Sequence, residues 1–566
     1  MSGSLFGWGR EHGRFAHLLI QTGIQVALWS LVFTIVSRPG GITYKLFLQD
    51  FPVLLFGSVA LIMLGVRSRG LPRVPDFLSG RLVSAIAIGV LAGAAAGTWL
   101  VFSDFALTRD EIMANFDAAF LASGRLIGAP AVEWQPYLDA LSPKFMLEVP
   151  PSAGWISSYL PGNAALRAIG ERTIGMEWVN PILAALSILT LFAIARRILP
   201  QDRTAAVVAA LLAASSAQLL TMAMTPYAMT AHLAFNLFWL WGFTRNNRFG
   251  DACAIASGFV ATGLHQLIFH PLFVAPFILH LWLRKERGRA LFYVLSYAAI
   301  GLFWASYWQL ILSGAGVEKS AASATGLSFL VARIAALFSD LSIDAPLTMG
   351  FNLLRFIAWQ NPVLLPLAIA SWPAIRSDEG IARPLAAGII LTIVAMLILL
   401  PWQGLGWGYR YLHGLIGSVC LLAAYGWRTL GDEDGRRFVL AATTAVALLL
   451  FLPLQLKLAH DYAAPRARAF EKATRTDADI VLIVPAEDLF DDLVRNSPDL
   501  SNRPKIMDLR KLSPAQIEVL CRAHSVALFD IRHSASTGFP QAVTSKEIAK
   551  YSARPEQIGC ARPLPL

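Results

Sequence analysis

The chain has 566 residues, of which 56% are hydrophobic and only 15% are charged, and its mean hydropathy is +0.55. This composition excludes an ordinary soluble protein and indicates a polytopic membrane protein. The formal net charge of +10 does not indicate a nucleic-acid partner, because the basic residues are divided among short loops between apolar segments.

Eleven apolar segments are long enough to cross a hydrocarbon core of about 30 Å, at roughly 20 residues each, and a further stretch, 252–283, brings the predicted number of spans to thirteen. The first lacks a small-residue cleavage site, so we expect a retained helix and not a signal peptide. The stretch 252–283 is too long for one span and is interrupted between His265 and Pro271, so we interpret it as two short helices joined by a tight turn. The other eleven are 15–36, 48–66, 83–106, 179–199, 203–222, 228–244, 290–312, 351–374, 385–401, 412–428 and 437–457.

The basic residues support this count, since cytoplasmic loops carry the excess of lysine and arginine. With the N-terminus inside, the loops around Arg67, Arg196-Arg197 and Arg284-Lys285 fall on the inner side. Merging 252–283 into one span would move every later basic loop to the wrong side. Thirteen spans also place the C-terminal tail outside.

Two outer loops are large, 107–178 and 313–350, and we expect them to contain short helices that lie along the membrane surface. After about residue 460 the chain becomes polar. The segments 479–484 and 525–529 predict buried strands, and Ser513-Pro514-Ala515-Gln516 predicts a capped helix start. The predicted fold is therefore an all-α membrane protein with a small C-terminal α/β domain outside the membrane.

The four cysteines are too few and too scattered for a metal framework or a disulfide scaffold. Cys253 and Cys420 fall in membrane segments. Cys521 and Cys560 share the C-terminal segment, where a disulfide between them is one possible arrangement.

An acidic pair, Asp110-Glu111, follows the third span at its outer mouth. Two adjacent carboxylates there have the chemistry to bind a divalent cation or to act as a general base on a hydroxyl. Thr108 and Glu111 also fit a capping box that opens a surface helix over 109–124. The two interpretations are compatible, because the cap can use Glu111 and leave Asp110 free.

Arg410 lies in a short outer loop between two spans, beside Trp407, Tyr409 and Tyr411. A cation at a membrane boundary is costly without an anionic partner, and lipid phosphate is the nearest one. The alternative is an arginine that reaches the headgroups from a helix end, among ordinary interfacial aromatic residues.

His265 and His270 flank the turn inside 252–283, again on the outer side. Five residues apart, they share a helix face only if the chain bends, so contact with substrate or metal competes with ordinary interfacial hydrogen bonding. Other charged loop residues, including Asp117, Asp139, Lys144 and Lys319, are expected to be solvated surface. The candidates Asp110, Glu111, His265, His270 and Arg410 all fall on one side of the membrane.

The pattern resembles the GT-C superfamily of membrane glycosyltransferases, in particular the bacterial branch with lipid A aminoarabinose transferases and protein O-mannosyltransferases. The resemblance covers roughly residues 83–457 and rests on three short features. These are the acidic pair Asp110-Glu111, the W-G-x-R-Y-L-like stretch 407–412, and a helix from Asn180-Pro181 to the paired Arg196-Arg197. Two additional spans precede this core, and the histidine turn matches no family signature.

The resemblance implies a division into two additional helices (1–82), a GT-C-like core (83–458) and an external domain (459–566). It implies a polyprenyl-phosphate-linked sugar as donor, and a glycan, lipid or protein as acceptor. By this implication Asp110 is the base, Glu111 orients the acceptor or a divalent cation, and Arg410, with Trp407 and Tyr411, binds the donor phosphate. The place of reaction would be the periplasmic face of the bacterial inner membrane, with inversion at the sugar.

Three other functions are weighed against this one. A polymerase or ligase of surface polysaccharide should have its large loop between late spans, whereas here the largest loop comes early. A lipid or polysaccharide flippase needs polar residues distributed through several spans, which here are nearly free of them. A membrane scaffold that presents the C-terminal domain would leave Asp110 and Arg410 replaceable without effect.

Overall fold

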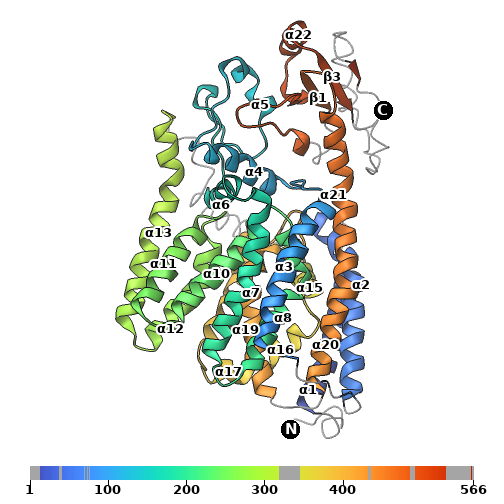
Figure 1. Ribbon diagram of the computed structural model, residues 1–566, viewed down its shortest axis with the longest axis vertical. Helices are drawn as coiled ribbons and strands as arrows, with labels where there is room; N and C mark the ends of the chain where they lie inside the picture. Colours follow the sequence, from blue (N-terminus) through green and yellow to red (C-terminus); the bar gives the residue numbers. More distant parts are fainter. Residues whose placement is uncertain are drawn as a thin grey trace.

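The computed structural model describes residues 13–36, 41–68, 71–72, 74, 77–317, 344–430, 435–484, 491–530 and 562–563. An elongated bundle of helices makes up most of the molecule, and a smaller layer lies at one end of it (Figure 1). Helix α1 (Arg14–Val36) begins at the opposite end of the bundle from the C-terminal domain (Figure 1). Seven described helices are long and apolar enough to cross a membrane, or up to eight with one bent pair.

Most helices of the bundle lie within the predicted segments. They are α1 (Arg14–Val36), α2 (Gly41–Val66), α3 (Gly80–Leu100), α7 (Val179–Ile198), α8 (Arg203–Ala214), α9 (Ala217–Ala223), α10 (Met229–Phe243), α11 (Arg248–Thr262), α12 (Phe269–Leu283), α13 (Arg287–Gly314), α15 (Asp344–Ala358), α16 (Leu364–Ala370), α17 (Trp372–Arg376), α18 (Ala382–Leu399), α19 (Ile416–Leu430), α20 (Arg436–Val446) and α21 (Leu452–Thr474). The predicted break within 252–283 is confirmed, since α11 ends at Thr262 and α12 begins at Phe269.

The predicted single span 351–374 is wrong, because α15, α16 and α17 replace it. The first break follows from Asn361 and Pro362. Proline has no backbone N–H to continue a helix, and the Asn361 Oδ1 atom accepts from the backbone N–H of Val363 at 3.1 Å. The Asn361 amide also donates to Ser215, at the 58° bend between α8 and α9, so two helix breaks are joined inside the bundle.

The predicted span 83–106 also ends early, because α3 stops at Leu100. Ser103 and Asp104 both have positive φ, and they turn the chain out of the bundle toward the external layer.

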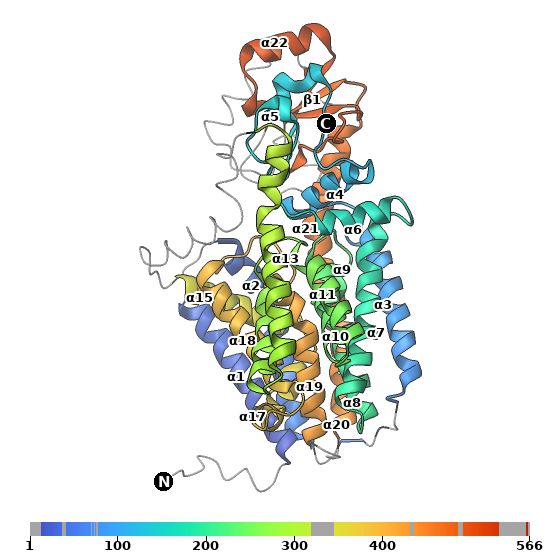
Figure 2. The same ribbon diagram turned by 90° about the vertical axis from the view of Figure 1, so that its left-hand side faces the viewer.

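The first outer loop contains the short helices that the sequence predicts. They are α4 (Arg109–Ala122), η3 (Val132–Tyr137), α5 (Leu138–Leu141), η4 (Pro151–Ala153), α6 (Gly162–Glu171) and η5 (Met176–Trp178). Helices α4 and α6 pack together across the end of the bundle (Figure 2). Most of the second outer loop, including Lys319, lies outside the described residues.

The C-terminal domain holds a parallel sheet in the order β2-β1-β3-β4. Its strands are β1 (Ile480–Val484), β2 (Lys505–Asp508), β3 (Val526–Asp530) and β4 (Arg562–Pro563). Strands β1 and β3 confirm the two predicted strands, and α22 (Pro514–Ala523) confirms the capped helix, with Ser513 and Gln516 in the predicted capping box. Cys521 is disulfide-bonded, whereas Cys560 lies outside the described residues.

The C-terminal domain packs on the first outer loop. Phe116, Trp134 and Trp155 share a buried cluster with the strands of the sheet. Side chains of the domain also donate to backbone carbonyls of the loop, from Asn496 to Leu141 at 2.9 Å and from Gln516 to Pro136 at 2.8 Å. Helix α21 continues from the bundle into the domain and passes through the expected boundary at 458/459 (Figure 1).

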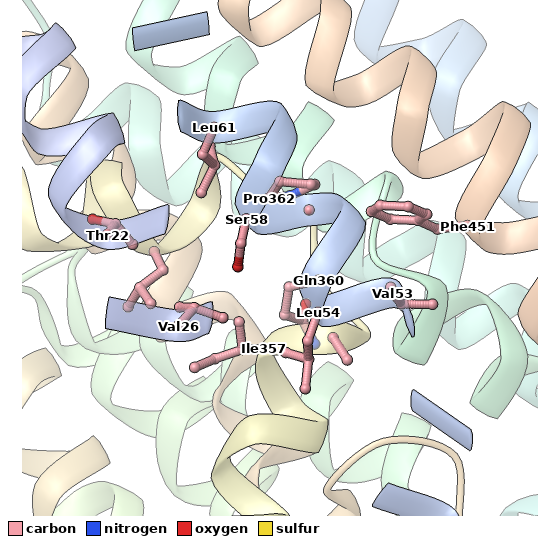
Figure 3. Close-up of a pocket in the computed structure, with 13 residues that line it drawn as sticks. Thr22, Val26, Val53, Leu54, Ser58, Leu61, Ile357, Gln360, Pro362 and Phe451 are labelled. Atoms are coloured by element: carbon pink, nitrogen blue, oxygen red, sulfur yellow. The ribbon is translucent and has the colours of Figure 1, made fainter. Parts of the chain in front are cut away.

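A small cavity of about 30 Å³ lies deep in the bundle where α1, α2 and the segment 357–365 meet (Figure 3). Its walls are mainly apolar, and the hydroxyl of Ser58 points into it (Figure 3). None of the residues that the sequence singles out for chemistry lines it. We therefore treat this cavity as a packing void.

Candidate active site

Asp110 and Arg410, which are 300 residues apart in the sequence, form an ion pair. Asp110 begins α4, and Arg410 begins a short 3₁₀ helix, η7 (Arg410–Leu415), after the loop that follows α18. Their side chains are 15% and 11% exposed, so the pair is largely withdrawn from water. The structure thus brings together the two residues on which the sequence analysis chiefly depends.

A second hydrogen bond fixes the Asp110 carboxylate, because the hydroxyl of Tyr159 donates to its Oδ1 atom. Burial alone would raise the pKa of Asp110. The charge of Arg410, the nearby His265 and the Tyr159 hydroxyl outweigh burial and lower that pKa below its ordinary value. Asp110 is therefore a carboxylate at neutral pH.

Glu111 makes a different contact from Asp110. Its Oε2 atom accepts from the backbone N–H of Thr108 at 2.6 Å, which is the capping contact that the sequence predicts. Burial raises the pKa of Glu111 to about 7. Glu111 does not line the cavity beside Asp110. One oxygen of its carboxylate is used by the helix N-terminus, and its predicted role in orienting an acceptor or a cation stays a prediction.

A cavity of about 580 Å³ opens beside Asp110 and Arg410. The first outer loop, the 401–410 loop, α21 and the C-terminal domain all contribute to its wall. Its lining residues are Ile42, Phe105, Leu107, Thr108, Arg109, Asp110, Phe145, Tyr227, Gly404, Leu405, Arg410, Tyr462, Arg466, Asp492, Leu493 and Arg495. Cations outnumber carboxylates on this wall, so the cavity favours an anionic ligand.

Hydrogen bonds from side chains to the backbone hold the 401–410 loop in place. Gln403 accepts from the backbone N–H of Arg410 at 3.0 Å and donates to the carbonyl of Gly408 at 2.8 Å. Gln218 on α9 donates to the carbonyl of Tyr409 at 2.9 Å, and Tyr227 donates to that of Leu405 at 2.9 Å. The backbone that carries Arg410 is therefore fixed before any ligand arrives.

A buried ion pair supports the same loop from inside the bundle. Arg355 on α15 donates from Nε to Asp50 on α2 at 3.0 Å, and its Nη2 atom donates to the carbonyl of Gly406 at 2.7 Å. Trp359 donates to the other oxygen of Asp50 at 2.9 Å. The side chains of Arg355 and Asp50 are 1% and 4% exposed. Helix α2, expected to lie outside the core, thus contacts the loop that carries Arg410 through this pair.

The two aromatic residues predicted to contact the donor phosphate do not line the cavity beside Arg410. Trp407 is buried among Phe102, Trp359 and Tyr462 and does not line the cavity. Tyr411 places its ring 5.4 Å from the Arg410 guanidinium carbon, as does Tyr227 on the cavity wall. These rings stabilise the cation and limit its side-chain freedom.

The two histidines have different surroundings. His265 stacks on Tyr159, with ring centroids 4.8 Å apart, and so lies behind Asp110. His270 bonds Asn236 and Tyr297, each at 2.7 Å, and is fully buried among helices. Only His265 is close enough to influence the acidic residue. His270 does not line the cavity beside Asp110, and its predicted contact with substrate or metal stays a prediction.

The donor set around Asp110 does not fit a divalent cation. Asp110 is paired with Arg410, and Glu111 caps its own helix. Within the described part of the chain, no group of three or more His, Cys, Asp or Glu side chains has an arrangement that could hold a metal ion. We therefore assign no catalytic step to a metal.

Several residues of the site were missed from the sequence. Arg109 and Asp492 form an ion pair at 2.8 Å that joins the first outer loop to the C-terminal domain. Tyr159 and Arg495 also belong to the site, but neither lies in a motif of recognisable spacing. Asp117, expected on the surface, is 3% exposed, and burial raises its pKa to about 7.

No protein-family model matches the chain, and no curated protein sequence matches it. Among solved structures, ArnT from Cupriavidus metallidurans bound to undecaprenyl phosphate is 14% identical, over 72% of this chain and 84% of that one, with a TM-score of 0.48. Its apo state is 13% identical over 73% and 83%, with a TM-score of 0.46. The Archaeoglobus fulgidus oligosaccharyltransferase in the apo form is 16% identical over 69% and 58%, with a TM-score of 0.36.

Proposed function

We propose that the protein is a membrane glycosyltransferase that moves a sugar from a polyprenyl-phosphate carrier to an acceptor hydroxyl. The observation that carries the proposal is the ion pair of Asp110 and Arg410 on the wall of a cavity of about 580 Å³. A general base and a phosphate-binding cation are the two groups that such a transfer requires, and here they are adjacent.

Arg410 is suited to bind a phosphate. Its Nε atom is buried and has no hydrogen-bond partner among the described residues. A buried donor without an acceptor costs about 1–3 kcal/mol, and a phosphate oxygen would remove that cost. Because guanidinium binds phosphate through two parallel hydrogen bonds, Arg410 can hold the donor and also neutralise the leaving group.

In the proposed reaction, Asp110 takes the proton of the acceptor hydroxyl. The acceptor oxygen bonds to the anomeric carbon of the sugar, while the bond from that carbon to the phosphate oxygen breaks. The electron pair of this bond stays with the polyprenyl phosphate, whose charge Arg410 stabilises. As Arg410 turns to the phosphate, Asp110 loses part of the interaction that lowers its pKa, and so becomes a stronger base.

The position of the site suits a lipid-borne donor. Asp110 and Arg410 lie where the bundle meets the external layer, at the level where α4 and α6 cross it (Figure 2). The arginines at the end of α7 lie toward the opposite end of the bundle. We propose that this opposite end is cytoplasmic and that the site faces the periplasm.

Replacement of Asp110 tests the proposal. Purified Asp110→Asn in lipid nanodiscs should lose at least about 100-fold of its transfer rate, because a general base contributes about 10²–10⁴-fold. The assay follows polyprenyl phosphate released from synthetic hexose, pentose and aminopentose donors, with an envelope lipid and glycan extract as the acceptor source. Binding of undecaprenyl phosphate should be retained, because Arg410 stays in place.

The matched control is Asp139→Asn, which makes the same change at an exposed position of the same outer loop. This variant should transfer at the wild-type rate. Wild-type turnover in Asp110→Asn would reject the role of Asp110 as the base.

A further inference from the structure

The cavity beside Asp110 has a second cation in a fixed position, Arg495, which the C-terminal domain supplies. Its Nε atom donates to the backbone carbonyl of Asp492 at 2.6 Å. Its guanidinium carbon lies 3.8 Å from the centroid of the Phe105 ring and 5.4 Å from that of Phe470. The backbone contact and the two rings hold the guanidinium against the wall of the cavity.

Among the described residues, no carboxylate forms an ion pair with Arg495. The other arginines near it differ, since Arg410 is paired with Asp110 and Arg109 with Asp492. Across the described residues, no acidic side chain lies within ion-pair distance of Arg495, and Asp492 offers it a backbone carbonyl. Burial lowers the pKa of Arg495 to about 9, which still leaves it protonated at neutral pH.

We propose that Arg495 binds a second anionic group, a phosphate or a carboxylate, on a substrate whose first phosphate is held by Arg410. This inference rests on the proposed function and names the charge of its substrates. The second group has two possible sources, either a second phosphate on the lipid carrier or an anionic acceptor. A buried cation that has no ion-pair partner among the described residues is the feature that such a group would complete.

Arg410 and Arg495 line one cavity but come from different parts of the chain. Arg410 belongs to the loop after α18, whereas Arg495 belongs to the external domain, and both line the same space of about 580 Å³. Phe105 contacts Phe470 on α21 at 5.9 Å, so the support under Arg495 is itself fixed. A preorganised guanidinium loses little freedom on binding.

The test measures binding to the full chain in lipid nanodiscs with two short-chain probes, farnesyl phosphate and farnesyl diphosphate. A second series titrates inorganic phosphate into protein saturated with farnesyl phosphate. The variants are Arg495→Gln and Arg495→Lys. The matched control is Arg522→Gln, which removes an exposed arginine from the same domain outside the cavity.

If the carrier supplies the second group, Arg495→Gln weakens farnesyl diphosphate about 10- to 100-fold and leaves farnesyl phosphate within about 2-fold. If the acceptor supplies it, the loss appears in phosphate binding to the saturated protein. In either case Arg495→Lys restores part of the affinity and Arg522→Gln has no effect.

Two results would overturn the inference. In one, no affinity responds to Arg495→Gln. In the other, farnesyl phosphate weakens as much as the diphosphate, so that Arg495 and Arg410 share one phosphate. Thermal unfolding of Arg495→Gln near the wild-type temperature excludes misfolding as the cause. These binding measurements do not depend on transfer, so loss of the role of Asp110 as the base would leave them interpretable.

Discussion

The ion pair between Asp50 and Arg355 should determine both the stability of the bundle and the position of Arg410. The perturbation is Asp50→Asn, which keeps the size of the side chain and removes its charge. In the native structure one oxygen of Asp50 accepts from Arg355 and the other from Trp359. An asparagine can accept only one of these bonds, and its amide group then faces a second donor.

The expected loss follows from the geometry. At an N–O distance of 3.0 Å and an effective dielectric constant of about 20, the attraction between the two charges is about 5 kcal/mol. Removing one partner of a buried pair leaves the other charge unpaired, which costs about 3–5 kcal/mol. We therefore expect the free energy of unfolding of Asp50→Asn to fall by about 3–5 kcal/mol.

The assay is an SDS unfolding titration in bicelles, combined with transfer rates at a temperature where the variant is folded. Ser58→Ala on the same helix is the control. Its hydroxyl is buried and has no hydrogen-bond partner within the described residues, so its removal should change stability by less than about 1 kcal/mol. The transfer rate of Asp50→Asn should fall as well, because Arg355 also holds the carbonyl of Gly406.

The double variant Asp50→Leu/Arg355→Met separates the two effects. Without either charge, most of the stability should return, whereas activity should not, since Gly406 has still lost its donor. If Asp50→Asn unfolds within 1 kcal/mol of wild type and transfers normally, the pair does not support the loop.

Two further predictions concern the site itself. Activity should depend on Asp110 as a carboxylate, so the acid limb of the kcat/KM profile should lie below the ordinary aspartate pKa of about 4. Arg410→Gln removes the charge that lowers the pKa of Asp110 and leaves the effect of burial dominant, so the acid limb of the pH profile should move to higher pH. An unchanged acid limb would contradict the role of Asp110 as the base. Gly408→Ala should lower activity at least about 10-fold. The backbone φ is +68° at this position, and a Cβ atom would lie 2.5 Å from the side chain of Gln218. Wild-type turnover at an unchanged KM would show that the loop geometry is dispensable.

Most of the bundle could be predicted from the sequence, because apolar length and loop charge are local properties. The histidine turn between α11 and α12 is an example, since the sequence is too long for one span there. The break at Asn361 was missed although Pro362 marks it locally, and the contact of Asn361 with Ser215, 146 residues away, could not be predicted from the sequence. Strand β2 was missed as well, because only Lys505–Asp508 form it beside a longer neighbour.

The candidate site, like the fold, could be predicted only in part. Asp110 and Arg410 could be found because each lies beside a span in a short recognisable motif. The roles of Glu111 and Asp117 could not be separated from that of Asp110 by residue type, since they depend on which way each carboxylate points. Arg495 belongs to the site only because the C-terminal domain folds back onto the first outer loop, and no spacing in the sequence contains that information.

Helix α2 and the C-terminal domain, which flank the core in the sequence, contribute to the site in different ways. Helix α2 supplies Asp50, which holds Arg355 and through it the backbone of the loop that carries Arg410. The C-terminal domain supplies Asp492 and Arg495 to the opposite wall. The two guanidinium groups that line the cavity therefore belong to different parts of the chain, Arg410 to the core and Arg495 to the C-terminal domain.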